Sequence, residues 1–230
     1  MTRFDRWYAD KSFTSDWTSD NFETWARFLP ANGVRCVLEI GSWEGRSAIF
    51  FLEYCPDCTI TCVDTFKGGQ EHVGSDGLDT IESRFDSNLA PYGARVEKIR
   101  SRSIPALDRL GVEGRSFDVI YIDGSHEQDD VVMDSFLAWR LLKQDGLLIW
   151  DDYRWKRDLP ERDRPEKAID AFLELHDREL EILHIAGQVI ARRRTRVDVR
   201  KRLPGMTIPR SLRNLYRFAM GTPITDFRTK

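Results

Sequence analysis

A glycine turn and four acidic residues stand where apolar runs of this sequence end. The turn is GSWEG, residues 41–45, and the acidic residues are Asp64, Asp123, Asp151 and Asp152. Glycines let the backbone approach a ligand closely, and a carboxylate in the position of Asp64 can accept hydrogen bonds from the two hydroxyls of a ribose. These features predict a site for a cofactor that contains adenosine.

The residues inside the glycine turn discriminate between adenosine cofactors. A dinucleotide site carries G-x-G-x-x-G, whose extra glycine leaves room for a pyrophosphate at the start of the next helix. Here Trp43 and Glu44 occupy that part of the turn, and an indole and an anion are poor neighbours for pyrophosphate. Both are acceptable beside the cationic sulfonium and amino acid group of S-adenosylmethionine (SAM). The turn therefore favours SAM over NAD.

The elements that would position these residues alternate between strand-like and helix-like runs. GRSAIFFLEYC follows the turn, SIPALDRL precedes the strand FDVIYIDG, and QDDVVMDSFLAWRLLK follows that strand. A further helix, EKAIDAFLELH, leads to a hairpin of LEILHIA and QVIARR around Gly187. Strands that alternate with helices and are apolar on both faces indicate a parallel sheet covered on each side. We therefore expect a Rossmann-like, doubly wound α/β fold with a mostly parallel seven-stranded sheet and a terminal antiparallel strand.

The segments around this sheet predict one domain with appendages. Residues 1–33 are expected to form an N-terminal helical cap, because Phe22, Trp25 and Phe28 recur at helical spacing. Residues 34–192 are the expected cofactor-binding domain. Within it, the glycine-rich residues 65–93 are interpreted either as a lid over the site or as a short helix with flanking loops.

The C-terminal extension, residues 193–230, is strongly basic. From Arg192 onward the chain carries twelve Lys or Arg residues against two Asp. The run SLRNLYRFAM could lay an apolar face on an anionic partner or a membrane surface. The interpretation that we favour is packing on the acidic domain of the same chain or on a second subunit, which is compatible with a homodimer.

Composition limits the partners and the location of the protein. The 230 residues are 41% hydrophobic and 32% charged, with a net charge of -3, so the chain is no general polycation and we expect no nucleic acid partner. A run of about 18 apolar residues is lacking, so we expect no transmembrane segment, and the start of the chain has no apolar signal-peptide core. The expected location is cytoplasmic.

Four cysteines, Cys36, Cys55, Cys58 and Cys62, allow a metal or redox interpretation through the motif CPDC. A structural zinc site usually needs four ligands, and Cys36 and Cys62 fall inside apolar strand-like runs, where free cysteine behaves as a small hydrophobic residue. Reduced structural thiols are the interpretation that we favour.

The string VLEIGSWEGRS, residues 37–47, resembles the first motif of class I SAM-dependent methyltransferases. Its form E-x-G-x-x-x-G-x-S is most similar to the metal-dependent O-methyltransferase branch, which includes catechol O-methyltransferase-like and bacterial sugar and natural-product enzymes. The likeness covers residues 34–192. It implies that the turn contacts the methionine end of SAM, that Asp64 binds the ribose and that Ser101 lies near the adenine. The implied cofactor residues are Glu39, Gly41, Ser42, Trp43, Gly45, Ser47, Asp64, Ser101 and Asp123.

The same resemblance implies a metal site and a general base. In that branch, acidic residues at the ends of the fourth and fifth strands hold magnesium, and these positions are Asp123, Asp151 and Asp152 here. Converging carboxylates repel one another unless a cation joins them, and oxygen ligands suit Mg²⁺ or another divalent cation. Where the branch has its catalytic lysine, this chain has His126, which can also remove a hydroxyl proton. The alternatives are a helix-capping Asp151, a solvated Asp152 and a His126 that only forms hydrogen bonds at the start of a helix.

The predicted function is magnesium-dependent methylation of a hydroxyl on a sugar or another small molecule, with SAM as methyl donor and with His126 and Asp123 as catalytic residues. His72, in the candidate lid, and Tyr153 and Trp155, as an aromatic wall, are predicted to contact the acceptor. Two alternatives stay open. One is a methyltransferase that needs no metal, and the other is a SAM- or nucleotide-binding module without catalysis.

Overall fold

A computed structural model describes residues 2–69, 77–155, 158, 160 and 164–194. Seven strands in this part of the chain form one sheet in the order β3-β2-β1-β4-β5-β7-β6. Strands β1 to β5 are parallel, and β7 runs antiparallel between β5 and β6. The predicted mostly parallel seven-stranded sheet with one antiparallel strand from a terminal hairpin is confirmed. The strands are β1 (Cys36–Ile40), β2 (Thr59–Asp64), β3 (Val96–Arg100), β4 (Phe117–Ile122), β5 (Leu142–Trp150), β6 (Leu180–Ile185) and β7 (Val189–Arg193).

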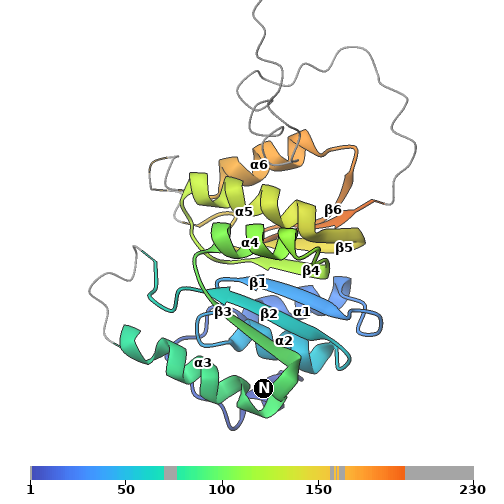
Figure 1. Ribbon diagram of the computed structural model, residues 1–230. Helices are drawn as coiled ribbons and strands as arrows, with labels where there is room; N and C mark the ends of the chain where they lie inside the picture. Colours follow the sequence, from blue (N-terminus) through green and yellow to red (C-terminus); the bar gives the residue numbers. More distant parts are fainter. Residues whose placement is uncertain (1, 70–76, 156–157, 159, 161–163, 195–230) are drawn as a thin grey trace, which may run out of the picture.

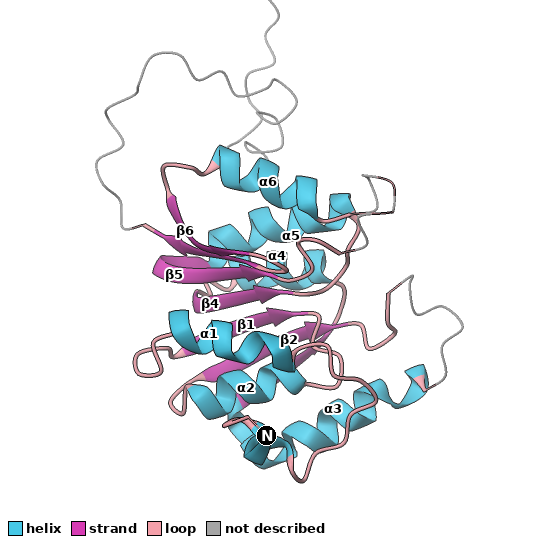
Figure 2. Cartoon of the chain, turned by 180° about the vertical axis from the view of Figure 1, so that it is seen from behind, coloured by secondary structure: helices cyan, strands magenta, loops and turns pink. Residues whose placement is uncertain are grey.

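Helices cover both faces of the sheet. They are α1 (Phe22–Phe28), α2 (Arg46–Tyr54), α3 (Ile81–Leu89), α4 (Ser103–Val112), α5 (Gln128–Leu141) and α6 (Glu166–Leu175). In Figure 1, α4 and α5 lie in front of the sheet, and the reverse view of Figure 2 brings α1 and α2 to the front. Side chains alternate along each strand between these layers. Leu38 packs with α4 to α6, whereas its neighbour Val37 packs with α1 to α3.

The boundary between α5 and β5 differs from the predicted one. The predicted helix ran to Lys143, but α5 ends at Leu141 and β5 begins at the next residue. Leu142 is already extended and pairs with Phe117 of β4, so sheet pairing overrides the helical pattern of the sequence. Asp145, in the left-handed region at φ 61°, then lets the strand adjust its register.

The candidate lid contains an ordered helix. Of the two interpretations of residues 65–93, a short helix with flanking loops fits the described part, because α3 buries Ile81, Phe85 and Leu89 against the α2 side of the core. His72 lies outside the described residues, as does the basic tail from residue 195 on. Among the helices of the described ranges, none has the length and apolar content that crossing a membrane requires.

The cysteines are free thiols. Cys55, Cys58 and Cys62 are buried, and loss of hydration raises the pKa of the Cys55 thiol to about 12. A thiol that does not ionise near neutral pH is a poor nucleophile and a poor metal ligand. Within the described part of the chain, the one group of side chains spaced to hold a metal contains no cysteine.

A buried histidine at the end of α6 predicts acid sensitivity. His176 is 1% exposed and its ring stacks on Phe172 at 4.1 Å, and burial lowers the pKa of its imidazole from 6.5 to about 4. Between these two pH values the unfolded chain binds a proton that the native state does not, so native stability falls as the pH falls.

We expect His176→Phe, which keeps the stacked ring, to remove this dependence. Relative to the variant, the wild type should lose up to about 3 kcal/mol of unfolding free energy as the pH falls from above 6.5 to 4. Urea titrations of both proteins at several pH values measure this difference. A difference that stays constant over the whole range would contradict the assignment of the neutral imidazole.

Candidate active site

The glycine turn after β1 packs directly against the backbone that follows β4. Gly41 has φ 83°, and a Cβ placed on it would lie 1.9 Å from the carbonyl oxygen of Asp123. Gly45 has the same φ and ends the turn at the start of α2. Only glycine combines this backbone conformation with so close an approach. The glycine turn and the backbone after β4 are therefore in direct contact at the carboxyl edge of the sheet.

Asp64 is bound to the glycine turn from the end of β2. Its Oδ2 accepts hydrogen bonds from the backbone N–H groups of Ser42 at 2.7 Å and Trp43 at 2.8 Å, and its Oδ1 accepts one from Phe66 at 2.6 Å. The backbone N–H of Ser101, after β3, donates to the carbonyl of Asp64 at 2.9 Å. The structure thus brings the predicted ribose carboxylate, the turn and the predicted adenine region together.

Glu39 is completely buried beneath the turn. The thiol of Cys62 lies 3.5 Å from its Oε2, and burial raises the pKa of this carboxyl to about 7. Neighbouring hydroxyls of Ser47 and Ser42 oppose the shift. Glu39 therefore supports the turn from below and does not line the cavity above it.

Carboxylates from β4 and β5 meet at one buried phenol. The hydroxyl of Tyr121 lies 2.9 Å from Oδ2 of Asp123 and also contacts Oδ2 of Asp151. A phenol has one proton and can donate to only one of them. Burial and the repulsion between the carboxylates raise the pKa of Asp123 well above its ordinary value and that of Asp151 to about 6. Such a cluster is stabilised by a retained proton or by a bound cation.

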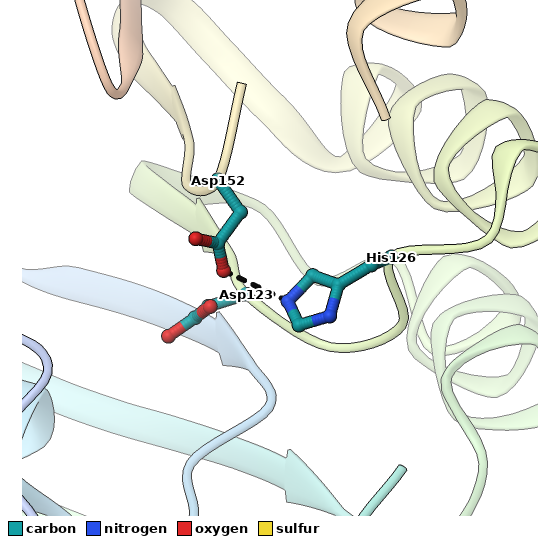
Figure 3. Close-up of side chains that lie close together, drawn as sticks. All are labelled: Asp123, His126 and Asp152. Carbon is teal, nitrogen blue, oxygen red and sulfur yellow. Dashed lines mark ion pairs between the residues drawn. The ribbon is translucent and has the colours of Figure 1, made fainter. Parts of the chain in front are cut away.

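Asp152 and His126 lie close to Asp123 (Figure 3), and all three residues line the cavity. The Nε2 of His126 lies 2.8 Å from Oδ2 of Asp152, and one ligand atom each from Asp123, His126 and Asp152 lie within 4.8 Å of one another. Asp152 reaches this position because its backbone is left-handed, with φ 55°. The ring of Trp155 packs on His126 at 4.3 Å.

Asp151 is oriented differently from its neighbour Asp152. Its Oδ1 accepts the backbone N–H of Asp152 at 2.8 Å, and its Oδ2 contacts Tyr121. The structure therefore groups the metal-ligating atoms of two of the three predicted carboxylates with the imidazole of His126. A metal site of Asp123, Asp151 and Asp152 stays a prediction.

A cavity of about 1470 Å³ opens at this edge of the sheet. It holds most of the predicted site residues, which are Gly41, Ser42, Trp43, Ser47, Asp64, Ser101, Asp123, His126, Asp151, Asp152 and Trp155. Residues before β1 also line it, among them Phe13, Asp16 and Trp17. Sequence reasoning missed these three, because they belong to no periodic pattern.

Tyr153 lies away from the place that the sequence suggested, and Glu44 binds a segment that the sequence did not indicate. The hydroxyl of Tyr153 donates to Asp170 on α6 at 2.7 Å, and its ring joins the core, so it does not line the described cavity. The carboxylate of Glu44, which the sequence allowed beside a sulfonium, is 1% exposed and accepts the backbone N–H of Thr14 at 2.6 Å. Glu44 thus binds the N-terminal segment at the edge of the cavity that it also lines.

Comparison with known proteins decides the family. A family model described as a methyltransferase domain matches residues 38–153, half of the chain, and these residues contain the turn, Asp64 and the acidic cluster. The chain belongs to this methyltransferase family. The chain is 28% identical over 133 residues to the O-methyltransferase hkm8 of Aspergillus hancockii, an alignment that covers 56% of this chain and 48% of that protein. It is 27% identical over 127 residues to protein R132 of Acanthamoeba polyphaga mimivirus, covering 51% and 52%.

The chain spans about half the length of these two curated relatives. Its fold is similar to that of an O-methyltransferase from Bacillus cereus in complex with S-adenosylhomocysteine (SAH), with a TM-score of 0.60, 18% identity and coverage of 79% of this chain and 84% of that one. It is also similar to the MycE methyltransferase of the mycinamycin pathway in complex with Mg and SAH, with a TM-score of 0.54, 20% identity and coverage of 88% and 56%. The predicted family and its Rossmann-like methyltransferase fold are confirmed.

Proposed function

We propose that this protein transfers the methyl group of SAM to a hydroxyl of a small-molecule acceptor, with a sugar as the first candidate, and that a divalent cation assists the transfer. The observation that carries this proposal is the convergence of Asp123, His126 and Asp152 in one cavity with the glycine turn and Asp64. Such a cavity combines a cofactor site with groups that can bind and deprotonate a hydroxyl.

The cavity fits a cofactor and an acceptor together. Its volume of about 1470 Å³ exceeds the roughly 300–1,000 Å³ of common small-molecule sites. The carboxylate of Asp64 lies in its wall beside Ser42 and Trp43, where it can accept hydrogen bonds from a ribose. When bound, SAM would supply an electrophilic methyl group.

The donor set at the end of β4 and β5 fits a divalent cation. Asp123 and Asp152 offer carboxylate oxygens, which suit Mg²⁺ and Mn²⁺, and His126 offers an imidazole nitrogen, which suits several transition metals. A cation at this site would polarise an acceptor hydroxyl and stabilise the developing alkoxide. Because the structure of the MycE methyltransferase is a complex with Mg, Mg²⁺ is the first cation to test.

His126 is proposed to accept the proton of the acceptor hydroxyl. Its Nε2 lies 2.8 Å from the Asp152 carboxylate, whereas its Nδ1 is buried, so Nε2 accepts the proton in the tautomer that carries its hydrogen on Nδ1 and when this nitrogen is not itself a ligand of the cation. Asp152, 2.8 Å away, then stabilises the imidazolium, and the packed ring of Trp155 holds the imidazole plane. General-base catalysis of this kind contributes about 100-fold to 10,000-fold in rate.

A turnover screen tests the proposal. Purified protein is incubated with SAM, Mg²⁺ and a panel of free sugars, glycosides and phenols, and SAH formation is followed by chromatography. We expect saturable SAH formation with at least one hydroxyl compound and, by calorimetry, binding of SAM. Binding of SAM with no turnover on any of these classes would favour the module without catalysis.

A further inference from the structure

The segment before α1 contacts the glycine turn through both residues that flank Gly45. We call residues 8–19 the N-terminal strap. On one side of Gly45, Glu44 accepts hydrogen bonds from the backbone N–H of Thr14 at 2.6 Å and from its hydroxyl at 3.0 Å. Because a buried carboxylate is costly unless it is paired, these bonds fix the strap to the turn.

On the other side of Gly45, the strap encloses Arg46. The guanidinium lies 4.1 Å from the ring centroid of Phe13 and 5.1 Å from that of Tyr8. It forms an ion pair with Asp16 at 3.1 Å and donates to the hydroxyl of Ser19 at 3.2 Å. Cation–π contacts and an ion pair to one guanidinium give the strap a defined position.

Helix α3 holds the same strap from a third direction. Asn88, 2% exposed, accepts the backbone N–H of Ser12 at 2.9 Å and donates to the carbonyl of Ser12 at 2.9 Å and to that of Glu44 at 3.0 Å. Arg84 of α3 pairs with the carboxylate of Glu44 at 3.3 Å. The strap, the turn and α3 therefore form one polar network around the buried side chains of Glu44 and Asn88.

The cavity side of the strap carries Trp17. Its side chain is 60% exposed, lines the cavity and lies 5.4 Å from the ring of Trp43 in the turn. The strap precedes residues 38–153, which match the methyltransferase family. An exposed indole that rests on the cofactor turn, held by a network of this kind, calls for a ligand that covers it.

We propose that residues 12–18 of the N-terminal strap are part of the cofactor site, with Glu44 and Arg46 as positioning residues and with Trp17 and Trp43 as an indole pair beside the cationic end of SAM. The inference rests on the proposed function in taking SAM as the cofactor. All contacts of the strap described above run to the turn, to Arg46 at the start of α2 and to α3, which favours the cofactor over the acceptor as its ligand. Indole faces attract cations, so the pair distinguishes SAM, with its sulfonium, from the uncharged thioether of SAH.

Two variants test the inference by calorimetry with SAM and SAH as probes. Asp16→Asn removes the ion pair to Arg46, and we expect it to weaken binding of both ligands up to about fivefold. Asp10→Asn is its matched control, because Asp10 lies on the same strap, is 76% exposed and pairs with Lys11. Trp17→Leu should lower the affinity for SAM about threefold and leave the affinity for SAH nearly unchanged.

Hydrogen exchange of the wild type provides a measurement that needs no variant. Addition of SAH should slow exchange of the backbone amides of residues 12–18. Each of three results would overturn the inference. The first is unchanged exchange on addition of SAH, and the second is equal ligand affinity of the Asp16→Asn and Asp10→Asn variants. The third is an equal loss of affinity for SAM and for SAH in Trp17→Leu. If the wild type binds neither SAM nor SAH, the proposed function itself fails.

Discussion

Gly41→Ala is expected to destabilise the protein by about 2–4 kcal/mol, through backbone strain and overpacking together, and to abolish cofactor binding. Its φ of 83° is strained for any residue with a Cβ, at a cost of about 1 kcal/mol. The new Cβ would also lie 1.9 Å from the carbonyl oxygen and 2.5 Å from the carbonyl carbon of Asp123, and overpacking of this kind costs about 1–3 kcal/mol.

The backbone around Gly41 cannot easily yield to this clash. The N–H of Gly41 donates to the carbonyl of Val63 at 2.9 Å, and the N–H of Asp123 donates to the carbonyl of Ile40 at 2.8 Å. To relieve the overlap, the backbone must break one of these two hydrogen bonds or move Asp123 away from the site. Either movement separates the turn from the acidic cluster.

Gly114→Ala is the matched control for Gly41→Ala. Gly114 has φ 70°, but a Cβ there meets nothing within 4 Å, so we expect a loss of about 1 kcal/mol and normal binding. Urea titration and calorimetry with SAH measure both effects. Equal losses of stability in the two variants, or normal SAH affinity in Gly41→Ala, would contradict the close approach at Gly41.

The fold and the functional edge were predictable because each follows from local patterns. Val37 and Leu38 are both apolar since β1 is covered on both faces, and this signal recurs in β2, β4 and β5, whereas the edge strand β3 is mostly polar. Asp64 and Asp123 follow apolar runs directly, and the carboxyl ends of parallel strands share one edge. Tyr121 was missed, although the sequence contains a signal for it. A residue two positions before Asp123 on a strand points to the same face of the sheet as Asp123.

The details of the acidic cluster depend on backbone conformation that the residue types do not specify. Asp151 and Asp152 are chemically identical, but the left-handed backbone of Asp152 directs its carboxylate to His126, while Asp151 contacts Tyr121. The contact of Glu44 with Thr14 joins residues 30 positions apart. Such long-range pairing cannot be derived from periodicity.

Asp152→Asn is expected to lower the turnover rate by about 100-fold or more, with SAH affinity unchanged. The substitution preserves shape but removes the negative charge that would bind the cation and stabilise the His126 imidazolium. Asp151→Asn is its matched control at the neighbouring position after β5, because both carboxylate oxygens of Asp151 contact Tyr121 or a backbone N–H. Mutation of a supporting residue of this kind typically lowers activity by about 10-fold to 100-fold. The acceptor found in the turnover screen serves as substrate.

Titration with Mg²⁺ or Mn²⁺ separates the two roles available to His126. If His126 is the base, His126→Gln lowers the turnover rate but leaves the metal concentration for half-maximal activity unchanged. If its Nε2 is a ligand, that concentration rises, as it does for Asp123→Asn. A loss in Asp151→Asn as large as in Asp152→Asn would instead favour the three-carboxylate site. Full activity of the wild type in EDTA would remove the cation from the reaction, and Asp152 would then act through His126 alone.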